Sequence, residues 1–322
     1  MSSNGEPTDL IGVDVGGTKA LGVRLRPGPG PGGIVDRVEL PSAAAGPDVV
    51  EVVARVVDRL VPDTVGAPPR ALGVGLAGFV DGDGIVRAAP NAAGLVDVDV
   101  VAALRSRTGL DAVVDNDANC VAVAAHEWSD PPVDDLVAVT LGTGIGGGII
   151  VDGRLLRGAR GFAGEPGHAV VDPDGPVCPC GQRGCWERFA SGSALRDAID
   201  SAVRAGDLDD SAVPGRTGVE LAAAVRAEVP GAGEVLDAFA ARVALGVAGL
   251  VAVLDPAVVA IGGGLSAMGR ELVDTVRRQL ELRHRAVLLS PAPRIELAPF
   301  GPDAGAVGAA VLAGRRIALR GG

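Results

Sequence analysis

The sequence predicts an α/β protein made of two related halves with a cleft between them, and three observations support this prediction. Short apolar runs of strand length alternate with longer segments whose apolar residues recur at helical spacing. An apolar run that ends in a glycine turn and is followed by a second run occurs near the start of the chain, and again about 127 residues later. At 322 residues the chain is also long enough for two domains with separate cores.

The first half opens with two strands joined by a glycine turn. We expect residues 10–15 to form a buried strand that ends in a tight turn at Gly16-Gly17-Thr18. Asn116 and Asp117 are expected at the junction of a strand and a helix. Further strands are expected at 20–25, 33–40, 71–77 and 111–114, helices at 48–60, 99–107 and 118–127, and a Pro/Gly loop at 27–33.

The second half begins in the same way. A strand at 136–141 ends at the turn Gly142-Thr143-Gly144, and a returning strand is expected at 149–151. A later strand leads directly into Gly262-Gly263-Gly264. Helices are expected at 191–205, 217–227, 234–254, 271–282 and 303–313, and strands at 257–261 and 294–298.

Composition narrows the class of protein. A net charge of -11 argues against a nucleic-acid-binding surface, and five Phe, two Trp and no Tyr leave few aromatic platforms for stacking. The longest uncharged apolar run, about a dozen residues, is too short to span a bilayer. The N-terminal segment lacks the basic and apolar regions of a signal peptide. We therefore expect a cytoplasmic protein with reduced thiols.

A cluster of cysteines predicts a structural zinc site. Cys178, Cys180 and Cys185 follow the pattern C-x-C-x4-C, and His168 lies ten residues upstream. Three thiolates and one imidazole complete a tetrahedral zinc site and leave no open position for a substrate. The alternative is a disulfide with one spare thiol, which a reducing compartment disfavours.

Two carboxylates flank these ligands. Glu165 lies three residues before His168, and Glu187 lies two residues after Cys185. A bound metal would hold both carboxylates on one rigid loop, while the second ring nitrogen of His168 donates a hydrogen bond outward. Two fixed acceptors and one donor suit a polyhydroxylated ligand. The alternative is that both carboxylates are solvated loop charges.

The two glycine turns predict phosphate binding. The first, Asp14-Val-Gly-Gly-Thr-Lys19, lacks the spacing of a Walker loop and contains the only lysine of the chain. Glycines let backbone N–H groups approach phosphate oxygens, Thr18 adds a hydroxyl donor, and Asp14 could hold a hydrated Mg²⁺. Either turn alone could be an ordinary hairpin, but two at equivalent positions favour phosphate binding.

Three further positions could contact ligands. Asp117 could serve only as a helix cap, or it could accept a proton from an alcohol that Asn116 orients. Asn91 could bind a hydroxyl group or simply occupy a turn. The glycines at 262–264 could lie against a flat ligand or form a plain turn between a strand and a helix.

These motifs together resemble the ROK family of bacterial sugar kinases and repressors. The matching stretches are Asp14 to Lys19, Asn116-Asp117, Gly164-Glu-Pro-Gly-His168 and Cys178-x-Cys-Gly-x-x-Gly-Cys-x-Glu187, in the order of that family and over nearly the whole chain. The resemblance implies the two-domain actin-like, hexokinase-type ATPase fold, with duplicated ribonuclease-H-like domains. We expect a small domain at 1–117 plus 301–322 and a large domain at 118–300 that carries the zinc knuckle.

The resemblance also implies a role for each matching residue. Asp117 would be the general base on the primary hydroxyl of the sugar. Sugar hydroxyls would be bound by Asn91, Asn116, Asp117, Glu165, His168 and Glu187. Structural Zn²⁺ would be bound by His168, Cys178, Cys180 and Cys185. ATP and Mg²⁺ would be surrounded by Asp14, Gly16, Gly17, Thr18, Lys19, Thr140, Gly142, Thr143, Gly144, Gly262, Gly263 and Gly264.

The implied activity is transfer of the γ-phosphoryl group of ATP to a hexose, with glucose the first expectation. A glucose-like C7-cyclitol and an N-acetylhexosamine stay open as acceptors, because many glucose-specific members carry an aliphatic residue where this chain has Pro166. A sugar-sensing regulator without catalysis is disfavoured, since only about nine residues precede the first strand. A binding protein that has lost catalysis is disfavoured by Asp14, Asp117 and both turns. The family also implies a homo-oligomer, a dimer or tetramer.

Overall fold

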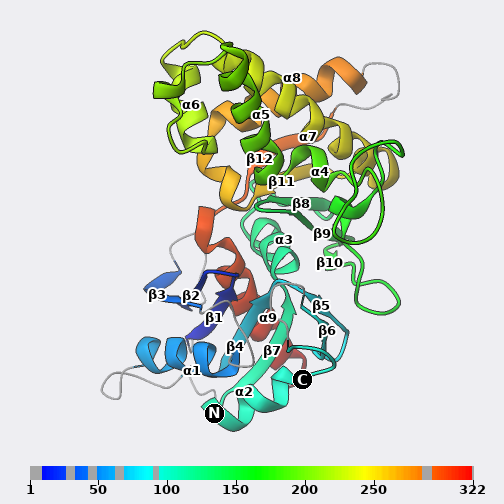
Figure 1. The fold of residues 1–322 in the computed structure, drawn as a ribbon. Coiled ribbons are helices and arrows are strands. Elements are labelled where there is room, and N and C mark those ends of the chain that lie inside the picture. Colours follow the sequence, from blue (N-terminus) through cyan, green and yellow to red (C-terminus); the bar gives the residue numbers. More distant parts are fainter. Residues whose placement is uncertain are drawn as a thin grey trace. The chain divides into compact units, whose positions relative to one another are not determined.

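The computed structural model describes residues 9–26, 33–42, 49–61, 69–89, 94–284 and 292–320. The chain is mixed α/β and divides into two compact units (Figure 1). The first unit comprises Met1–Pro132, Arg154–Ala163 and Asp303–Gly322, and the second comprises Val133–Gly153 and Gly164–Pro302. Each range is continuous in sequence, so the chain crosses between the units four times.

The first unit contains a five-stranded sheet with the order β3-β2-β1-β4-β7. Strand β1 pairs with β2 in antiparallel register and with β4 in parallel register, and β7 is parallel to β4. The strands are β1 Leu10–Val15, β2 Lys19–Leu25, β3 Ile34–Pro41, β4 Ala71–Leu76 and β7 Asp111–Asn116, with a separate hairpin of β5 Phe79–Val80 and β6 Val86–Ala88. The helices are α1 Val49–Leu60, α2 Val100–Thr108, α3 Asp117–Glu127 and α9 Ala304–Arg320.

Alternation along β1 sends side chains to two different layers. Ile11 and Val13 join the apolar cluster formed with α1 and α2. Gly12 faces the other way, and a Cβ there would lie 1.8 Å from the carbonyl oxygen of Ala306 in α9. Gly73 of β4 meets Ala309 of the same helix just as closely. Glycine is therefore required on this face, because α9 packs its backbone directly on the sheet.

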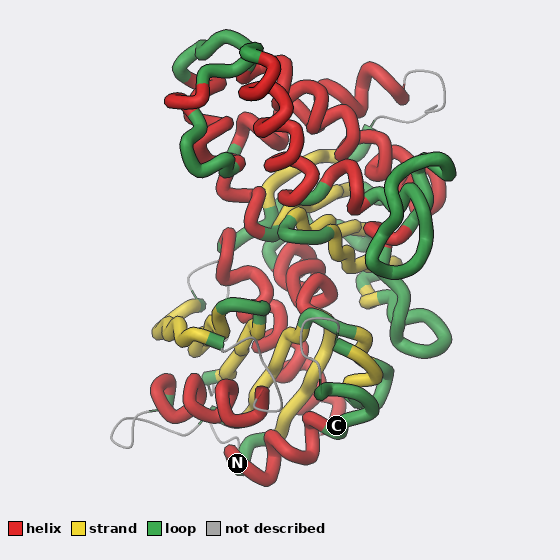
Figure 2. The backbone as a smooth tube through the Cα atoms, in the orientation of Figure 1, coloured by secondary structure: helices red, strands yellow, loops and turns green. Residues whose placement is uncertain are grey.

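The second unit contains a sheet with the order β10-β9-β8-β11-β12. Its strands are β8 Leu136–Leu141, β9 Ile145–Val151, β10 Arg154–Leu155, β11 Val258–Gly262 and β12 Arg294–Leu297. Its helices are α4 Glu187–Ala190, α5 Gly192–Ala205, α6 Gly218–Arg226, α7 Ala232–Leu254 and α8 Arg270–His284, with 3-10 turns η1 Pro166–His168, η2 Asp210–Ala212, η3 Gly264–Met268 and η4 Gly301–Asp303. Figure 2 shows that the stretch from β10 to α4 is almost entirely loop.

Helix α7 is the core helix of the second unit. By length and composition alone it could cross a membrane. However, Leu236, Phe239, Val243 and Val247 on its inner face are buried in the apolar cluster of this unit. An apolar helix that packs in this way needs no membrane to account for its composition.

The structure differs from the sequence prediction in several places, and the β5–β6 hairpin, for example, was not predicted. Strand β9 begins at Ile145 and not at 149, because Gly147 and Gly148 continue the ladder with β8. The last helix extends to Arg320 and not to 313.

The predicted domain division after residue 117 also differs from the observed one. Helix α3 stays with the first unit, because Gly308 of α9 packs against the Cys120 carbonyl, where a Cβ would come within 1.7 Å. Asn91 and residues 27–32 of the expected loop lie outside the described residues.

Candidate functional site

The first glycine turn joins β1 to β2 and is held from one side. The Gly16 N–H donates to the Lys19 carbonyl oxygen at 2.9 Å. The Ser42 hydroxyl donates to the Gly16 carbonyl oxygen at 2.6 Å, and the Ser42 N–H donates to that of Thr18 at 3.1 Å. Gly17 is exposed, and a Cβ there would meet nothing within 4 Å. The turn therefore leaves its backbone open at Gly17.

Lys19 takes part in an exposed charge network. Its ammonium lies 3.3 Å from a carboxylate oxygen of Glu39, which Arg37 also contacts. Exposed ion pairs of this kind contribute little to stability, because water screens them. The lysine therefore stays available for an anionic ligand.

Asp14 and Asp117 form a carboxylate pair beside this turn. Parallel register places Asp14 of β1 level with Gly75 of β4, and Gly75 level with Asp115 of β7. A Cβ on Gly75 would lie 3.4 Å from the Asp117 Cα and 3.7 Å from the Asp14 carboxylate. Because glycine occupies the strand between them, the two aspartates come close enough to interact.

The two carboxyl groups hold protons more strongly than ordinary aspartates. Burial and, to a lesser extent, the charge of Asp117 raise the pKa of Asp14 to about 7, while the charge of Lys19 acts in the opposite direction. Burial also raises the pKa of Asp117, against the hydrogen bond that its Oδ1 accepts from the Ala118 N–H. A raised carboxyl pKa near the working pH is what a general base needs.

Asn116 caps helix α3. Its Oδ1 accepts hydrogen bonds from the N–H groups of Ala118 at 2.9 Å and Asn119 at 3.1 Å, and its Nδ2 donates to the Gly78 carbonyl oxygen at 3.2 Å. This cap fixes where helix α3 starts, and with it the position of Asp117.

The second glycine turn joins β8 to β9 and is held by helix α5. The Gly192 N–H donates to the Gly142 carbonyl oxygen at 2.7 Å, and the Ser193 hydroxyl donates to that of Thr143 at 3.1 Å. A Cβ on Gly192 would lie 2.8 Å from the Gly142 carbonyl oxygen, so glycine lets the helix approach the turn.

The glycines after β11 lie beside this turn. Gly262 is paired with Thr140 in parallel register. Gly263 has φ of 76°, and a Cβ there would lie 2.6 Å from the Leu141 carbonyl oxygen. Thr140, the second turn and residues 262–264 therefore come together within the second unit, although the sequence separates them widely.

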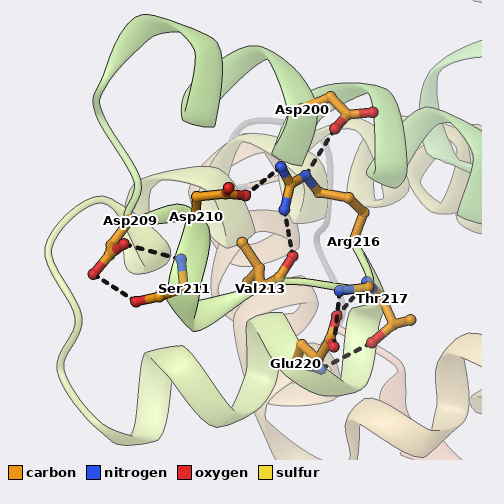
Figure 3. Close-up of polar contacts among 9 residues, drawn as sticks. Asp200, Asp209, Asp210, Ser211, Val213, Arg216, Thr217 and Glu220 are labelled. Carbon is orange, nitrogen blue, oxygen red and sulfur yellow. Dashed lines mark hydrogen bonds and ion pairs between the residues drawn. The ribbon is translucent and has the colours of Figure 1, made fainter.

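A polar hub supports the helix that packs behind these glycines. In Figure 3, Arg216 binds Asp200 of α5, Asp210 of η2 and the Val213 carbonyl oxygen. Thr217 and Glu220 then form a capping box that starts α6. Gly218, the first residue of α6, lies against Met268 and Leu265 of η3. None of these residues was predicted from the sequence to lie near the site.

His168 and three cysteines form the predicted metal cluster. Their ligand atoms all lie within 4.8 Å of one another. The His168 Nδ1 is 3.9 Å from the Cys178 Sγ, and the Cys180 and Cys185 sulfurs are 3.6 Å apart. A tetrahedral zinc site has ligand separations of about 3.5–3.8 Å, so the four residues fit Zn²⁺. All four cysteines of the chain are free, which removes the disulfide alternative.

The cysteines of the cluster lie close enough to affect one another's pKa. Burial and the two neighbouring thiols raise the pKa of Cys185 to about 12. A bound metal ion reverses this effect, because it deprotonates the thiols that coordinate it. Gly181 and Gly184 adopt φ of 93° and 68°, a backbone conformation that glycine permits within the tight turns of this loop.

Glu187 links the metal cluster to the second glycine turn. Its Oε2 accepts a hydrogen bond from the Ile145 N–H at 3.0 Å, and its Oε1 lies 4.0 Å from the Cys178 Sγ. A Cβ on Gly144 would lie 2.1 Å from Oε2. On the other side of the knuckle, the Glu165 carbonyl oxygen accepts from the His168 N–H at 3.2 Å. Glu187 therefore contacts both the cysteine cluster and the second glycine turn, and the backbone of Glu165 is bonded to His168.

Comparisons with known proteins identify the family. The ROK family model matches residues 10–316. A glucokinase from Streptomyces coelicolor is 34% identical over 314 residues, 94% of this chain and 96% of that protein. An N-acetylmannosamine kinase from Shigella flexneri is 30% identical over 307 residues, 94% and 98% of the two chains. The crystal structure of a ROK glucokinase from Streptomyces griseus, in complex with glucose and AMPPNP, matches with a TM-score of 0.85 and 32% identity, over 95% of this chain and 99% of that one.

The chain belongs to the ROK family. It has the actin-like, hexokinase-type ATPase fold, as the sequence predicted. It is an ATP-dependent sugar kinase.

Proposed function

We propose that this enzyme is a glucokinase, which transfers the γ-phosphoryl group of ATP to the primary hydroxyl of glucose with Asp117 as general base. The observation that carries the proposal is the pair of half-buried carboxylates, Asp14 and Asp117, which interact beside the first glycine turn. Two similar proteins are glucokinases, and one of them was crystallised with glucose and AMPPNP.

In the proposed reaction Asp117 accepts the proton of the sugar hydroxyl. The hydroxyl oxygen then forms a bond to the γ-phosphorus, the bond from that phosphorus to the β,γ-bridging oxygen breaks, and ADP leaves. Positioning and neutralisation of charge do most of the work in such a transfer. Asp14 would hold Mg²⁺ through water, and this ion would supply positive charge to the phosphates when bound.

Backbone N–H groups would hold the phosphates. In the first unit these would come from Gly17 and Thr18, with Lys19 adding a positive charge, because the Gly16 N–H is bonded within the turn. In the second unit they would come from Thr143 and Gly144, because the Gly142 N–H donates to the Gly144 carbonyl oxygen. Residues 262–264 would lie along the nucleoside. The open backbone of the first turn and the anchored backbone of the second support this assignment.

The sugar would be held from the metal knuckle. His168, Cys178, Cys180 and Cys185 would bind structural Zn²⁺, which leaves the second ring nitrogen of His168 to donate to a sugar hydroxyl. The carboxylates of Glu165 and Glu187 would accept from others, together with Asn91 and Asn116. Glu187 already accepts one hydrogen bond, but a carboxylate offers about four acceptor positions.

An N-acetylhexosamine is the second candidate acceptor, because a similar protein of nearly equal length is an N-acetylmannosamine kinase. Pro166, which starts η1, lies against Gly147 of β9, where a Cβ would come within 2.6 Å of the ring. The proline therefore fixes the backbone between Glu165 and His168. A glucose-like C7-cyclitol is the third candidate. A cytoplasmic location and a homo-oligomeric state belong to the same proposal.

ADP release with Mg-ATP tests the proposal across glucose, mannose, fructose, N-acetylglucosamine, N-acetylmannosamine and a valiolone-type cyclitol. We expect glucose to give the highest kcat/KM. Turnover confined to the cyclitol or to an amino sugar would contradict the glucokinase assignment and leave the kinase class intact.

A further inference from the structure

Asp115, the residue two positions before the proposed base, is a buried carboxylate with a complete set of partners. Its side chain is only 7% exposed. Its Oδ1 accepts from the Asn116 N–H and from the Asn119 Nδ2, both at 2.8 Å. Its Oδ2 accepts from Arg157, at 3.1 Å from Nε and 2.6 Å from Nη2. A buried charge is tolerated when it is paired and hydrogen-bonded in this way.

Arg157 belongs to a segment that packs on the first unit at three places. The segment Arg154–Ala163 clusters with that unit, although the residues on both sides of it belong to the second. Besides the Arg157 contact, the Phe162 ring meets the Phe79 ring edge-on, with 5.5 Å between centroids. A Cβ on Gly161 would lie 2.7 Å from the Asp81 Cα. Gly164 and Glu165 follow this segment directly.

The charge of Arg157 also acts on the Cys120 thiol, which the nearby carboxylates affect in the opposite direction. Burial raises the pKa of the Cys120 thiol well above its usual value, Asp115, Asp14 and Asp117 raise it further, and Arg157 acts in the opposite direction. Three carboxylates therefore surround this thiol, and Arg157 contributes compensating positive charge. Removing it would leave Asp115 buried without its ion-pair partner beside two other acids.

We propose that Arg157 is a positioning residue for phosphoryl transfer. Through Asp115 it fixes the β7–α3 junction that presents Asp117, and the same contact docks the segment that leads into Glu165. The junction that presents the proposed base and the segment Arg154–Ala163 are thus held together by one ion pair, in which two nitrogens of Arg157 donate to one oxygen of Asp115. The inference rests on the proposed function for the roles of Asp117 and Glu165, but the contact itself does not.

Kinetics of three variants test this role. Arg157→Gln removes the positive charge and the guanidinium N–H groups that donate to Asp115. Arg157→Lys keeps the positive charge but lacks the pair of guanidinium donors. Arg160→Gln is the matched control, because Arg160 lies in the same segment and makes no ion pair among the residues described. We expect Arg157→Gln to lower kcat by about 10- to 100-fold, since small displacements of a reacting group cost this much. The KM for ATP should change less than about threefold, Arg157→Lys should fall between wild type and Arg157→Gln, and Arg160→Gln should match wild type.

Amide hydrogen exchange gives a readout that does not depend on catalysis. In Arg157→Gln we expect faster exchange at both 115–119 and 154–163, with exchange in α7 unchanged. A kcat equal to that of Arg160→Gln, or faster exchange confined to 154–163, would overturn the proposal. If Arg157→Gln does not fold, kcat and hydrogen exchange are measured in Arg157→Lys and compared with those of Arg160→Gln. Normal turnover in Asp117→Asn would remove the base assignment, whereas paired changes in exchange would still establish that Arg157 positions the junction.

Discussion

The two glycine turns share a backbone design but differ in what holds them and in what surrounds them. The first is held by one residue, Ser42, and lies beside the Asp14 and Asp117 carboxylates. The second is held by Gly192 and Ser193 of α5 and abuts Glu187, which also contacts the metal cluster. The comparison shows that two turns with a similar backbone can have different surroundings, and therefore different roles. We infer that the first serves the chemistry of phosphoryl transfer, and that the second positions the nucleotide with support from the metal.

The largest expected effect comes from the carboxylate beside the first turn. Asp117→Asn should lower kcat by roughly 10²- to 10⁴-fold, because the variant cannot accept the hydroxyl proton, and sugar binding should persist. Coupled ADP assays and calorimetry measure the two quantities. Asp99→Asn is the matched control, because Asp99 lies at the start of another helix of the first unit, where its side chain accepts from the Ala102 N–H. Near-normal turnover in Asp117→Asn would refute its role as base.

Loss of the metal should affect the second turn more than the first. Cys180→Ser should release zinc, lower the Tm and raise the KM for both sugar and ATP, because Glu187 loses its rigid support. Metal analysis, calorimetric melting and kinetics check this outcome. A chelator should change wild type in the same direction and should have no further effect on the variant. Wild-type protein that contains no zinc, or a variant with an unchanged KM for ATP, would contradict the link between the knuckle and the turn.

Matched alanine substitutions compare the two turns directly. Gly144→Ala places a methyl group 2.1 Å from the Glu187 carboxylate, which should cost about 1–3 kcal/mol of unfolding free energy and weaken ATP binding. Gly17→Ala places its methyl group in open space, so the unfolding free energy should change by less than about 0.5 kcal/mol. Denaturant titrations provide both values. Equal losses of stability would mean that the turns are not anchored differently.

The smallest expected effect concerns the pH dependence of stability. Burial raises the pKa of Asp14 above its unfolded value of 3.8 to about 7, so the folded state binds this proton more tightly. The stability associated with this proton is fully present below the unfolded pKa and is lost as pH rises through the folded pKa. Asp14→Asn should therefore raise the Tm by a few degrees at about pH 8 and much less at about pH 4, while activity falls. A Tm difference that does not vary with pH would rule out this titration.

Local motifs made part of the site predictable from the sequence. The spacing of Cys178, Cys180 and Cys185 brings their sulfurs together within one short loop, and each glycine turn is complete within a few residues. The caps at Asn116 and Ser191 are likewise short-range, and so the helix starts were located well.

Contacts between distant parts of the chain were not predictable. Ser42 holds a turn 26 residues away, and Arg157 pairs with a carboxylate 42 residues away. No sequence motif near either residue predicts its contact, because single serines and arginines are common in loops. The early start of β9 was not predicted, because glycines lower strand propensity. Only the pairing of these glycines with β8 shows that they belong to the strand.

The most direct test of the central claim is the pH dependence of kcat at saturating glucose and Mg-ATP, measured in wild type and in Asp117→Asn from about pH 5 to 9. If Asp117 is the base, the wild-type rate falls on the acid side as this carboxylate becomes protonated. The small residual rate of the variant then lacks that acid limb. An acid limb of the same shape in both proteins, at comparable rates, would contradict the assignment and place the proton acceptor elsewhere.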